Sequence, residues 1–549
     1  MKNDIKVLAA ILLVTILIRI PFTPHEIGYD SFRTHWMAES ILKEGTAKWI
    51  VHPASLFGLY PYSYPSFVPY MLAILSVVLG ISIKFTILIY SILLSVISIL
   101  FMFIFARFGY KKIEIAIFSS LFFVISPIFL DFTIWSASTR NLFITLMPLL
   151  LFLLLKYEKT RKNTFLALSL LLFFIEALTH RLFIYLIGFF IIPFFITKIY
   201  VQLRDLQKIN IIDRHVHIIA SLIFLVLFAI QFSKISLFCH LQYNYIQGLF
   251  FTAGTYEDFL SCNLSRPVLL FNMMIDYVSR NGLPFIFAPV AAILWISKIR
   301  RRDYSFPELF FVTSLLATSS LSILGTYTTL FFLPVFSLMS AVGLDYVSHR
   351  ISKKKLSTHA LVAFFLLTSI LFSSFMNIYW LTKVEDSTQN NKWMREGTNT
   401  VTQFLNKNPE YGMLSIDRRV GMQLRALTNY QVLPYSFFNM ELFAFDHINS
   451  NNLDSELSIK PSLSTNYFWT LETEFDPETD WSTLIQSNIN SEEGINLVQR
   501  YDVHYIVANE LAEYLPYKPH WIFYKDVFNA SNKIYDNGVE GVWVLTYSH

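Results

Sequence analysis

The sequence is poor in charge and in cysteine, and it lacks the motifs of several common protein classes. Charged residues make up 15% of its 549 residues, whereas a soluble domain usually carries about 25%. Two cysteines cannot build a disulfide-rich scaffold. Gly-rich phosphate loops, dinucleotide fingerprints and Cys/His metal clusters are missing, which argues against a nucleotide-sugar-binding Rossmann domain. No basic domain or zinc-finger signature indicates a nucleic-acid partner.

Apolar residues fill the space that the missing charges leave. They make up 54% of the chain, Phe alone contributes 53 residues, and the mean hydropathy is +0.48. A soluble globule cannot bury that much apolar surface, so we expect a polytopic α-helical membrane protein. Apolar stretches long enough to cross a bilayer recur up to residue 380. About eleven spans are predicted, at 5–22, 85–106, 113–131, 141–157, 164–180, 182–200, 217–233, 282–299, 307–325, 328–347 and 359–380.

The amino-acid composition changes after Trp380, from mainly apolar to mainly polar residues. Residues 1–380 form the predicted membrane domain, and residues 381–549 are polar enough for a separate soluble domain. Val503–Ala508 and Gly541–Tyr547 have the composition of strands, and Trp393–Leu405 that of an amphipathic helix. These signals predict a small α/β or α+β domain.

The positions of Lys and Arg predict the orientation. Basic clusters occur in alternating loops, near residues 107–112, 156–162, 198–214, 298–302 and 350–355. These loops and the N-terminus are expected in the cytoplasm. All of these basic loops fall on the cytoplasmic side only if Pro65–Leu79, which contains Pro65 and Pro69, lies in the outer interface and does not cross the membrane. Residues 23–84, 234–281 and 381–549 are then extracytoplasmic. Cys239 and Cys262 share one of these outer loops, so a disulfide between them is predicted, with two free thiols as the alternative.

Ionisable residues near the spans gather at the predicted outer ends, where they need a physical reason. They are Arg19, Asp131, Arg140, Glu176, His180 and Arg181. The middles of the spans are almost free of charge, unlike the midplane sites of ion-coupled transporters. This distribution indicates a reaction site at the outer membrane surface. Ordinary interfacial anchoring is the alternative for any single residue.

The first outer loop carries a carboxylate, Asp30, directly before a predicted amphipathic helix from Ser31 to about Lys43, which Gly45 ends. The position is that of an N-cap, and capping is one explanation for the residue. A carboxylate just above the bilayer can also act as a general base. From the residues alone, both explanations stay open.

The order of these features resembles the GT-C superfamily of membrane glycosyltransferases, which includes oligosaccharyltransferase and protein O-mannosyltransferase catalytic subunits and aminoarabinose transferases. Tyr60–Tyr70 is similar to the Pro-rich segment before the family's second span, Ser126–Arg140 to its second outer loop, and Leu178–Arg181 to its Thr-His-Pro-like turn. The resemblance implies a catalytic carboxylate at Asp30, with Glu26 as the second candidate. The Trp-Trp-Asp-Tyr-Gly motif of oligosaccharyltransferases is replaced by Gly412–Gly421, which argues against transfer to Asn.

The combined prediction is an inverting glycosyltransferase that uses a polyprenyl- or dolichyl-phosphate sugar at the outer leaflet and passes it to a lipid, glycan or protein acceptor. The leaving phosphate needs positive partners, for which the candidates are Arg140, His180, Arg181 and Arg33, with Arg19 in reserve. No cofactor is expected for a monophosphate donor, whereas a diphosphate donor favours a divalent metal held by Glu26 and Asp131. A transporter and a non-catalytic assembly protein remain the alternatives.

Overall fold

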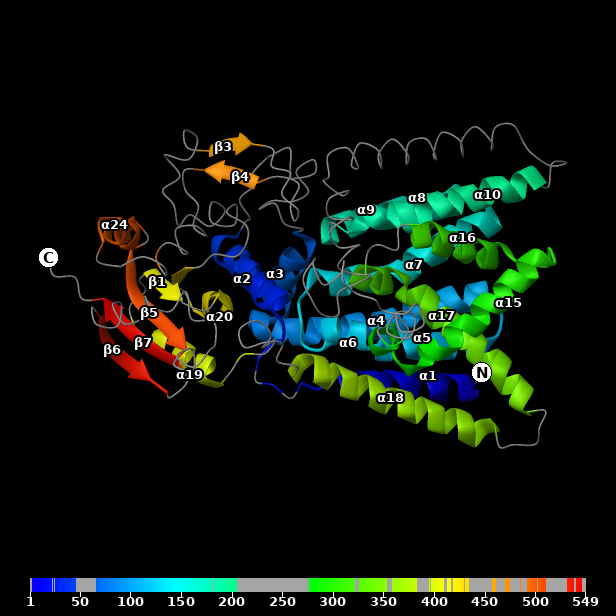
Figure 1. The fold of residues 1–549 in the computed structure, drawn as a ribbon, viewed down its shortest axis with the longest axis horizontal. Coiled ribbons are helices and arrows are strands. Elements are labelled where there is room, and N and C mark those ends of the chain that lie inside the picture. Colours follow the sequence, from blue (N-terminus) through cyan, green and yellow to red (C-terminus); the bar gives the residue numbers. More distant parts are fainter. Residues whose placement is uncertain are drawn as a thin grey trace, which may run out of the picture.

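The computed structural model describes most of the N-terminal helical part and separate pieces of the C-terminal part (Figure 1). Apart from a few single positions, the described ranges are 2–21, 25–45, 66–180, 182–204, 277–320, 325–352, 358–382, 396–408, 412–415, 418–428, 430–433, 457–460, 470–473, 491–500, 502–509, 531–537 and 540–545. The predicted span 217–233, the Cys239–Cys262 pair and Tyr60 lie outside these ranges.

Long apolar helices form a bundle whose axes run roughly along one direction (Figure 1). Helices occupy every predicted span that falls in the described ranges, because these segments have no water partner for their backbone amides and must satisfy them internally. The bundle consists of α1 (Lys2–Ile18), α4 (Ile83–Gly109), α5 (Ile113–Ile125), α6 (Pro127–Thr133), α7 (Thr139–Thr160), α8 (Asn163–Thr179), α9 (Phe183–Leu186), α10 (Ile192–Arg204), α15 (Ala288–Arg300), α16 (Phe306–Ser320), α17 (Gly325–Ser352) and α18 (Thr358–Thr382).

Five of the described helices are long and apolar enough to cross a membrane, and a bent pair would make six. Others, such as α1 and α8, are shorter apolar helices. Two stretches are not α-helical: the π-helix η3 (Ile187–Ile191) between α9 and α10, and the 3₁₀-helix η4 (Leu283–Phe287) before α15. The expected count of about eleven spans stays a prediction.

The predicted span at 113–131 consists of two helices, α5 and α6, that meet at an angle of 58°, a bend that the sequence analysis did not predict. The break lies at Ser126-Pro127, where Pro127 starts α6. Proline has no backbone N–H and clashes with the preceding turn, so it ends one helix and suits the first turn of the next. The bend leaves the carbonyl of Val124 free to accept a hydrogen bond from Arg19 Nη2, at 3.0 Å.

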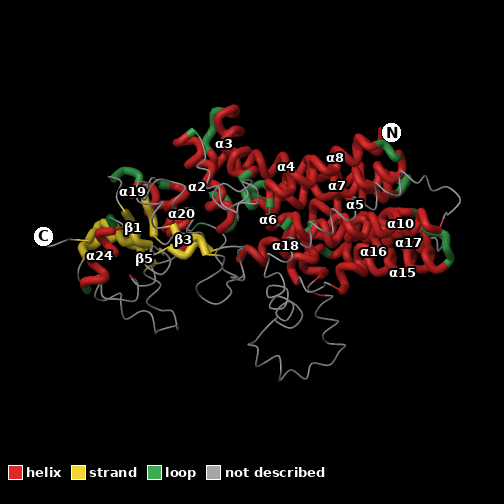
Figure 2. The backbone as a smooth tube through the Cα atoms, turned by 90° about the horizontal axis from the view of Figure 1, so that it is seen from above, coloured by secondary structure: helices red, strands yellow, loops and turns green. Residues whose placement is uncertain are grey.

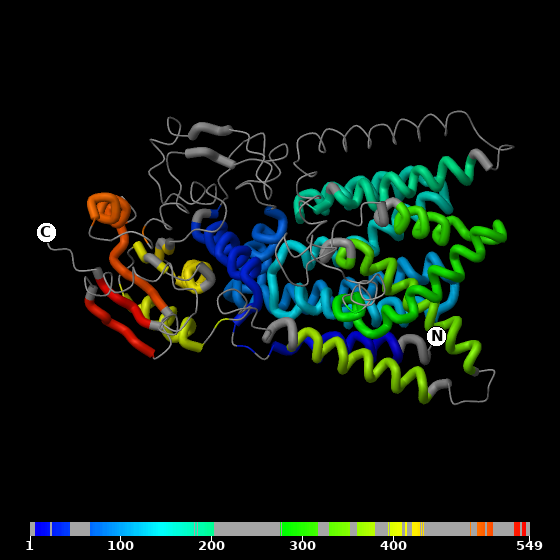
Figure 3. The backbone as a smooth tube through the Cα atoms, viewed as in Figure 1, coloured from blue at the N-terminus to red at the C-terminus, as the bar shows by residue number. Residues whose placement is uncertain are grey.

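Two ends of the bundle can be told apart by their contacts. At one end, Lys112 pairs with Asp345, Lys298 with Glu308, and Lys156 lies over the ring of Phe108. These contacts join the turns that carry predicted cytoplasmic basic clusters, so those turns share one end, which we call the far end. The opposite end, called the sheet end, lies next to the C-terminal sheet (Figures 1 and 3).

Two helices lie obliquely across the sheet end: α2 (Tyr29–Glu44) and α3 (Phe67–Leu79) (Figure 1). Helix α2 ends at Gly45, whose φ of 71° is left-handed, as the sequence predicts. Helix α3 has 13 residues, about 20 Å at 1.5 Å per residue, and it packs against α2 and α4.

The C-terminal part contains a five-stranded sheet in the order β2-β1-β5-β7-β6. Strands β1 (Gly412–Ser415), β2 (Gln431–Leu433) and β5 (Val503–Asn509) are parallel to one another. Strand β7 (Glu540–Leu545) is antiparallel to both of its neighbours, β5 and β6 (Ser531–Asp536). Strands β3 (Leu457–Lys460) and β4 (Thr470–Thr473) form a separate pair. Three helices pack against strands of the five-stranded sheet: α19 (Glu396–Leu405), α20 (Arg418–Leu427) and α24 (Glu492–Arg500). Viewed from above, the sheet forms one end of the elongated molecule (Figure 2).

Candidate active site

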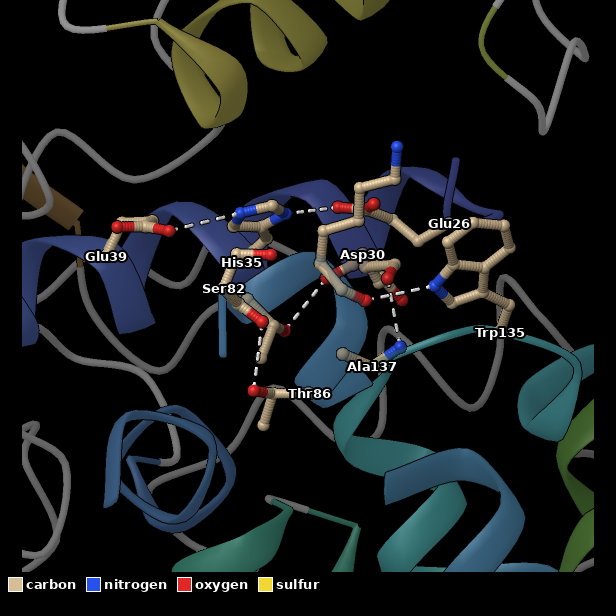
Figure 4. A network of polar contacts seen from close by, with 11 residues as sticks. Glu26, Asp30, His35, Glu39, Ser82, Thr86, Trp135 and Ala137 are labelled. Atoms are coloured by element: carbon tan, nitrogen blue, oxygen red, sulfur yellow. Dashed lines mark hydrogen bonds and ion pairs between the residues drawn. The ribbon is translucent and has the colours of Figure 1, made fainter. Parts of the chain in front are cut away.

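The loop between α6 and α7 lies against the start of α2 at the sheet end. The amide of Ile27 donates to the carbonyl of Trp135 at 2.8 Å, and the amide of Ala137 donates to Ser31 Oγ at 2.9 Å. The Trp135 indole N–H donates to the Lys84 carbonyl of α4 at 3.1 Å. Figure 4 shows the contacts of the Trp135 indole and the Ala137 amide beside Asp30. The loop and the start of α2 are therefore fixed to each other although they are far apart in sequence.

This arrangement brings Asp30 and Arg140 together. Arg140 Nη1 donates to Asp30 Oδ2 at 2.7 Å. The two side chains are 25% and 34% exposed, so a ligand can reach both. Arg140 belongs to the first turn of α7, which Ser138 caps, and its guanidinium lies 5.6 Å from the centre of the Phe132 ring. The structure thus joins the predicted base to one of the predicted phosphate-binding residues.

The expectation that Asp30 is an N-cap is wrong. Helix α2 starts at Tyr29, its N-cap is Gly28, and no side chain caps it. Gly28 has a φ of 97°, a conformation that favours glycine. Asp30 is one residue inside the helix, and its carboxylate reaches Arg140 instead of the amides of its own first turn.

Glu26, the second candidate base, lies in a different environment from Asp30. Its side chain is fully buried, and one carboxylate oxygen forms an ion pair with His35 Nδ1. The other ring nitrogen of His35, Nε2, lies 3.6 Å from Glu39, whose side chain is 36% exposed. The three side chains form a row along the start of α2 (Figure 4). Glu26 is therefore not within reach of solvent or of an acceptor in this structure.

The charges of Glu26 and His35 stabilise each other against burial. Burial alone would raise the pKa of Glu26, but the charge and hydrogen bond of His35 outweigh it, so that pKa lies below its ordinary value. Burial likewise opposes the charged form of His35, yet Glu26 and Glu39 raise the pKa of His35 to about 9. The pair is therefore charged at neutral pH.

Two contacts connect the helices of the C-terminal part to this end of the bundle. His25 Nε2 lies 2.9 Å from the side-chain oxygen of Asn399 on α19. Arg425 of α20 stacks over the ring of Trp36 on α2, with 3.5 Å between Cζ and the ring centre. Burial lowers the pKa of His25, which favours its neutral form. The C-terminal helices are thus held against α2 and the residues just before it.

Arg19 is a structural residue here. It is 1% exposed, and its guanidinium donates to Thr133 Oγ1 and to the carbonyls of Thr15 and Val124. Its hydrogen bonds fix the bend between α5 and α6.

The other predicted phosphate ligands have different positions. His180 is mostly buried beside Phe143 of α7, and its Nδ1 accepts the amide of Leu182. Arg33 is buried in α2, and Arg181 lies outside the described residues. Glu176 is fully buried in α8 with both carboxylate oxygens unbonded.

The described residues form no ready-made metal cluster, and the possible ligands Glu26 and Asp131 stay a prediction. Among them, no three His, Cys, Asp or Glu side chains gather as ligands of one ion. One oxygen of Glu26 is already engaged by His35, and Asp131 is half-buried on α6.

Sequence reasoning missed His35, Trp36, Trp135 and Arg425. The spacing of His35 and Glu39 by four residues on one helix face is a signal for the first of these.

No protein-family model and no curated protein sequence matches the chain. Solved structures do match. The oligosaccharyltransferase AglB from Archaeoglobus fulgidus, in complex with an inhibitory peptide and a dolichol-phosphate, is 13% identical with a TM-score of 0.57, over 93% of this chain and 70% of that chain. ArnT from Cupriavidus metallidurans in the apo state is 11% identical with a TM-score of 0.53, over 99% and 98%. The mycobacterial arabinofuranosyltransferase AftD is 13% identical with a TM-score of 0.51, over 98% and 41%. All three are GT-C glycosyltransferases, and the chain has their fold.

Proposed function

We propose that this protein is a glycosyltransferase that moves a sugar from a polyprenyl- or dolichyl-phosphate to an acceptor hydroxyl. The observation that carries the proposal is the Asp30–Arg140 pair, a carboxylate and a guanidinium that are both reachable at one end of a GT-C bundle. The named neighbours act on sugars, and one of them was solved with a dolichol-phosphate. The fold and the pair together support lipid-linked sugar transfer.

In the proposed reaction, Asp30 accepts the proton of the acceptor hydroxyl as that oxygen attacks the anomeric carbon. The bond between this carbon and the donor phosphate oxygen breaks, and its electron pair leaves with the lipid phosphate. Attack opposite the leaving group inverts the configuration. Arg140 stabilises the charge that develops on the phosphate, the role that fixed donors serve in transition states. We assign His180, Arg181 and Arg33 as candidates for the remainder of the phosphate site.

The pair has a consequence for how the donor binds. Arg140 Nη1 donates to Asp30 Oδ2 at 2.7 Å. A donor phosphate would compete for the same guanidinium and release the carboxylate for the acceptor. Because the pair is partly exposed, exchanging one anion for another costs little compared with a buried pair.

We further propose that the sheet end is extracytoplasmic and the N-terminus cytoplasmic. The basic turns of the far end support this orientation, since cytoplasmic loops carry an excess of Lys and Arg. A single cysteine introduced at Asn537, which is half-buried beside α19, or at Asn532 of β6, which is exposed, reports the side. Labelling of the Asn532→Cys variant by a membrane-impermeant reagent in intact cells is expected, and labelling only after permeabilisation would contradict the orientation.

The activity is tested with purified protein in detergent and a panel of labelled donors. The panel pairs hexoses and pentoses with polyprenyl or dolichyl chains, each as a monophosphate and as a diphosphate, and a membrane extract supplies acceptors. The expected result is transfer from at least one monophosphate donor, which is lost in Asp30→Asn. Absence of transfer from every donor, or equal transfer by wild type and Asp30→Asn, would contradict the proposal.

A further inference from the structure

We infer that Glu26 and His35 are positioning residues, whose buried ion pair holds Asp30 in register with Arg140. This inference rests on the proposed function of the Asp30–Arg140 pair. Glu26 stands before α2 and His35 in its second turn, so their contact closes the chain segment that contains Asp30. A bridge from residue 26 to residue 35 fixes where the helix begins and therefore where the Asp30 carboxylate lies.

The next contacts along the segment transmit this constraint to the loop that leads to Arg140. Ile27, next to Glu26, is bonded to Trp135, and Ser31, next to Asp30, is bonded to Ala137. Ala137 is three residues from Arg140. The two hydrogen bonds therefore lie on either side of Asp30 in one segment and lead to Arg140 in the other. Figure 4 shows Ala137 and Trp135 beside Asp30.

The loop is held in a conformation that it would not adopt alone. Trp135 has a φ of 42°, an unusual value for a bulky residue. Such backbone angles persist only when the surroundings over-determine them. The Trp135 carbonyl and indole are both bonded, to the Ile27 amide and to the Lys84 carbonyl. Losing the Ile27 contact would remove one of the restraints on this loop.

The burial of the ion pair is the second observation. Glu26 is fully buried, and its second oxygen has no hydrogen-bond partner. Removing a carboxylate from water is costly, and a buried pair often gives no net stability over an apolar one. Fixing one geometry is a use for such a pair that an apolar replacement would not provide.

The inference is tested with Glu26→Gln, His35→Gln, the double variant, and Glu39→Gln as the control. Glu39 touches the other side of His35, and its change leaves the Glu26–His35 pair in place. Each single variant at the pair is expected to lower turnover about 10²-fold, the effect of a misplacement of about 1 Å. The KM for the donor should change much less, because Arg140 keeps its own support from α7. The control variant should stay near wild-type turnover.

The double variant separates positioning from misfolding. Two Gln side chains can hydrogen-bond to each other without leaving a buried charge, so the double variant should turn over about tenfold faster than either single variant, a coupling that contacting residues show. Equal losses in the single and double variants would contradict a bridging role. Wild-type turnover in both single variants would overturn the inference.

The pH profile is a readout that a bulk structural role would not move. His35 loses its charge as the pH rises through about 9, so wild-type turnover should fall in that range. This alkaline limb of the pH profile should be missing in the double variant. Glu39→Gln should move the limb to lower pH, because Glu39 helps to raise the pKa of His35. The titratable and charged groups around His35 include Tyr29, Asp30, Arg33, Glu39 and Lys43 on α2, His25 and Glu26 before it, and Tyr70, Lys84, Arg140 and Arg425 on neighbouring elements.

A donor-free measurement keeps this inference distinct from the proposed function. Hydrogen exchange at the amides of Ile27 and Ala137 reports the two bracketing bonds without any substrate. Both amides are expected to exchange faster in Glu26→Gln than in the wild type and at the wild-type rate in Glu39→Gln, even if no donor is found. Unchanged exchange would overturn the positioning role. Complete loss of transfer in Glu26→Gln, with normal transfer in Asp30→Asn, would instead make Glu26 the base and contradict the proposed function.

Discussion

The two ends of the bundle both carry ion pairs, but they treat the charges differently. At the far end, Lys112 is 53% exposed in its pair with Asp345, and Lys298 is 48% exposed in its pair with Glu308. The far end also holds one buried pair, in which Lys198 lies 3.5 Å from Glu158. At the sheet end, Glu26 and His35 are buried, and Asp30 and Arg140 are only partly exposed.

The difference shows which charges need an explanation. Exposed pairs cost little to form and contribute about 0–1 kcal/mol, so the Lys112 and Lys298 pairs of the far end need no role beyond anchoring helix ends. Buried charges are expensive, and two such groups bracket Asp30. A buried pair occurs at each end, but the one at the sheet end stands beside a pair, Asp30–Arg140, in which both side chains are partly exposed and a ligand can reach them. The comparison supports the proposed site at the sheet end, and four measurements can break or sharpen it.

The largest effect is expected for Asp30→Asn. Asparagine cannot accept the acceptor proton, so turnover should fall by about 10²–10⁴-fold, the usual contribution of a general base. The unfolding midpoint should stay close to that of the wild type, because the lost pair with Arg140 is partly exposed. Both are measured on the same purified sample. Normal turnover in a folded variant would remove Asp30 from the mechanism.

The next effect is expected for Arg140→Gln. Losing one fixed donor to a developing oxyanion costs about 10²–10³-fold in turnover, and the donor KM should also rise. Arg140→Lys should recover only part of this loss, since Lys cannot reproduce a planar guanidinium. Initial rates over a range of donor concentrations give both constants. A change in the acceptor KM alone, with turnover and the donor KM unchanged, would contradict the phosphate-binding role.

The Glu26–His35 pair predicts how stability depends on pH. The pKa of His35 is raised from 6.5 to about 9, so its contribution is fully present below pH 6.5 and is lost as the pH rises through about 9. One pKa unit is worth about 1.4 kcal/mol, which makes the loss on the order of 3 kcal/mol. The pKa of Glu26 is lowered, so its share is lost only in acid. Unfolding midpoints between pH 6 and pH 10.5 should decline in the wild type and change less in the Glu26→Gln, His35→Gln double variant.

The smallest effect is expected at the far end. Lys112→Met removes an exposed pair with Asp345 and should change the free energy of unfolding by less than about 1 kcal/mol. Turnover should not change. Sugar transfer and the unfolding midpoint are compared with those of the wild type. A large loss of transfer would show that the far end takes part in function and would break the comparison.

Much of the helical part could be predicted from the sequence, because long apolar segments have few other solutions in a membrane. The strands at Val503–Ala508 and Gly541–Tyr547 and the helix near Trp393–Leu405 appear as β5, β7 and α19. The bend at Ser126-Pro127 was missed although proline gave a signal for it. The start of α2 was misplaced because Gly28, and not an acidic residue, precedes the helix.

The candidate site was predicted only as a set of separate residues. Asp30 and Arg140 were both named, but nothing in a single sequence pairs residues 110 positions apart. His180 and Arg19 were grouped with them, whereas the structure uses Arg19 to hold the bend of α5 and α6. Glu26 was treated as an alternative base because exposure cannot be read from residue type.

By itself, the sequence determined that this protein has membrane helices, which of its loops are basic, and which polar residues stand near helix ends. These properties are local, since they follow from hydrophobicity and charge along the chain. Only the tertiary structure decided that Asp30 meets Arg140 and that Glu26 is buried against His35. Those contacts depend on how α2, α4 and the loop before α7 pack, and packing is set by the whole bundle, not by any one segment.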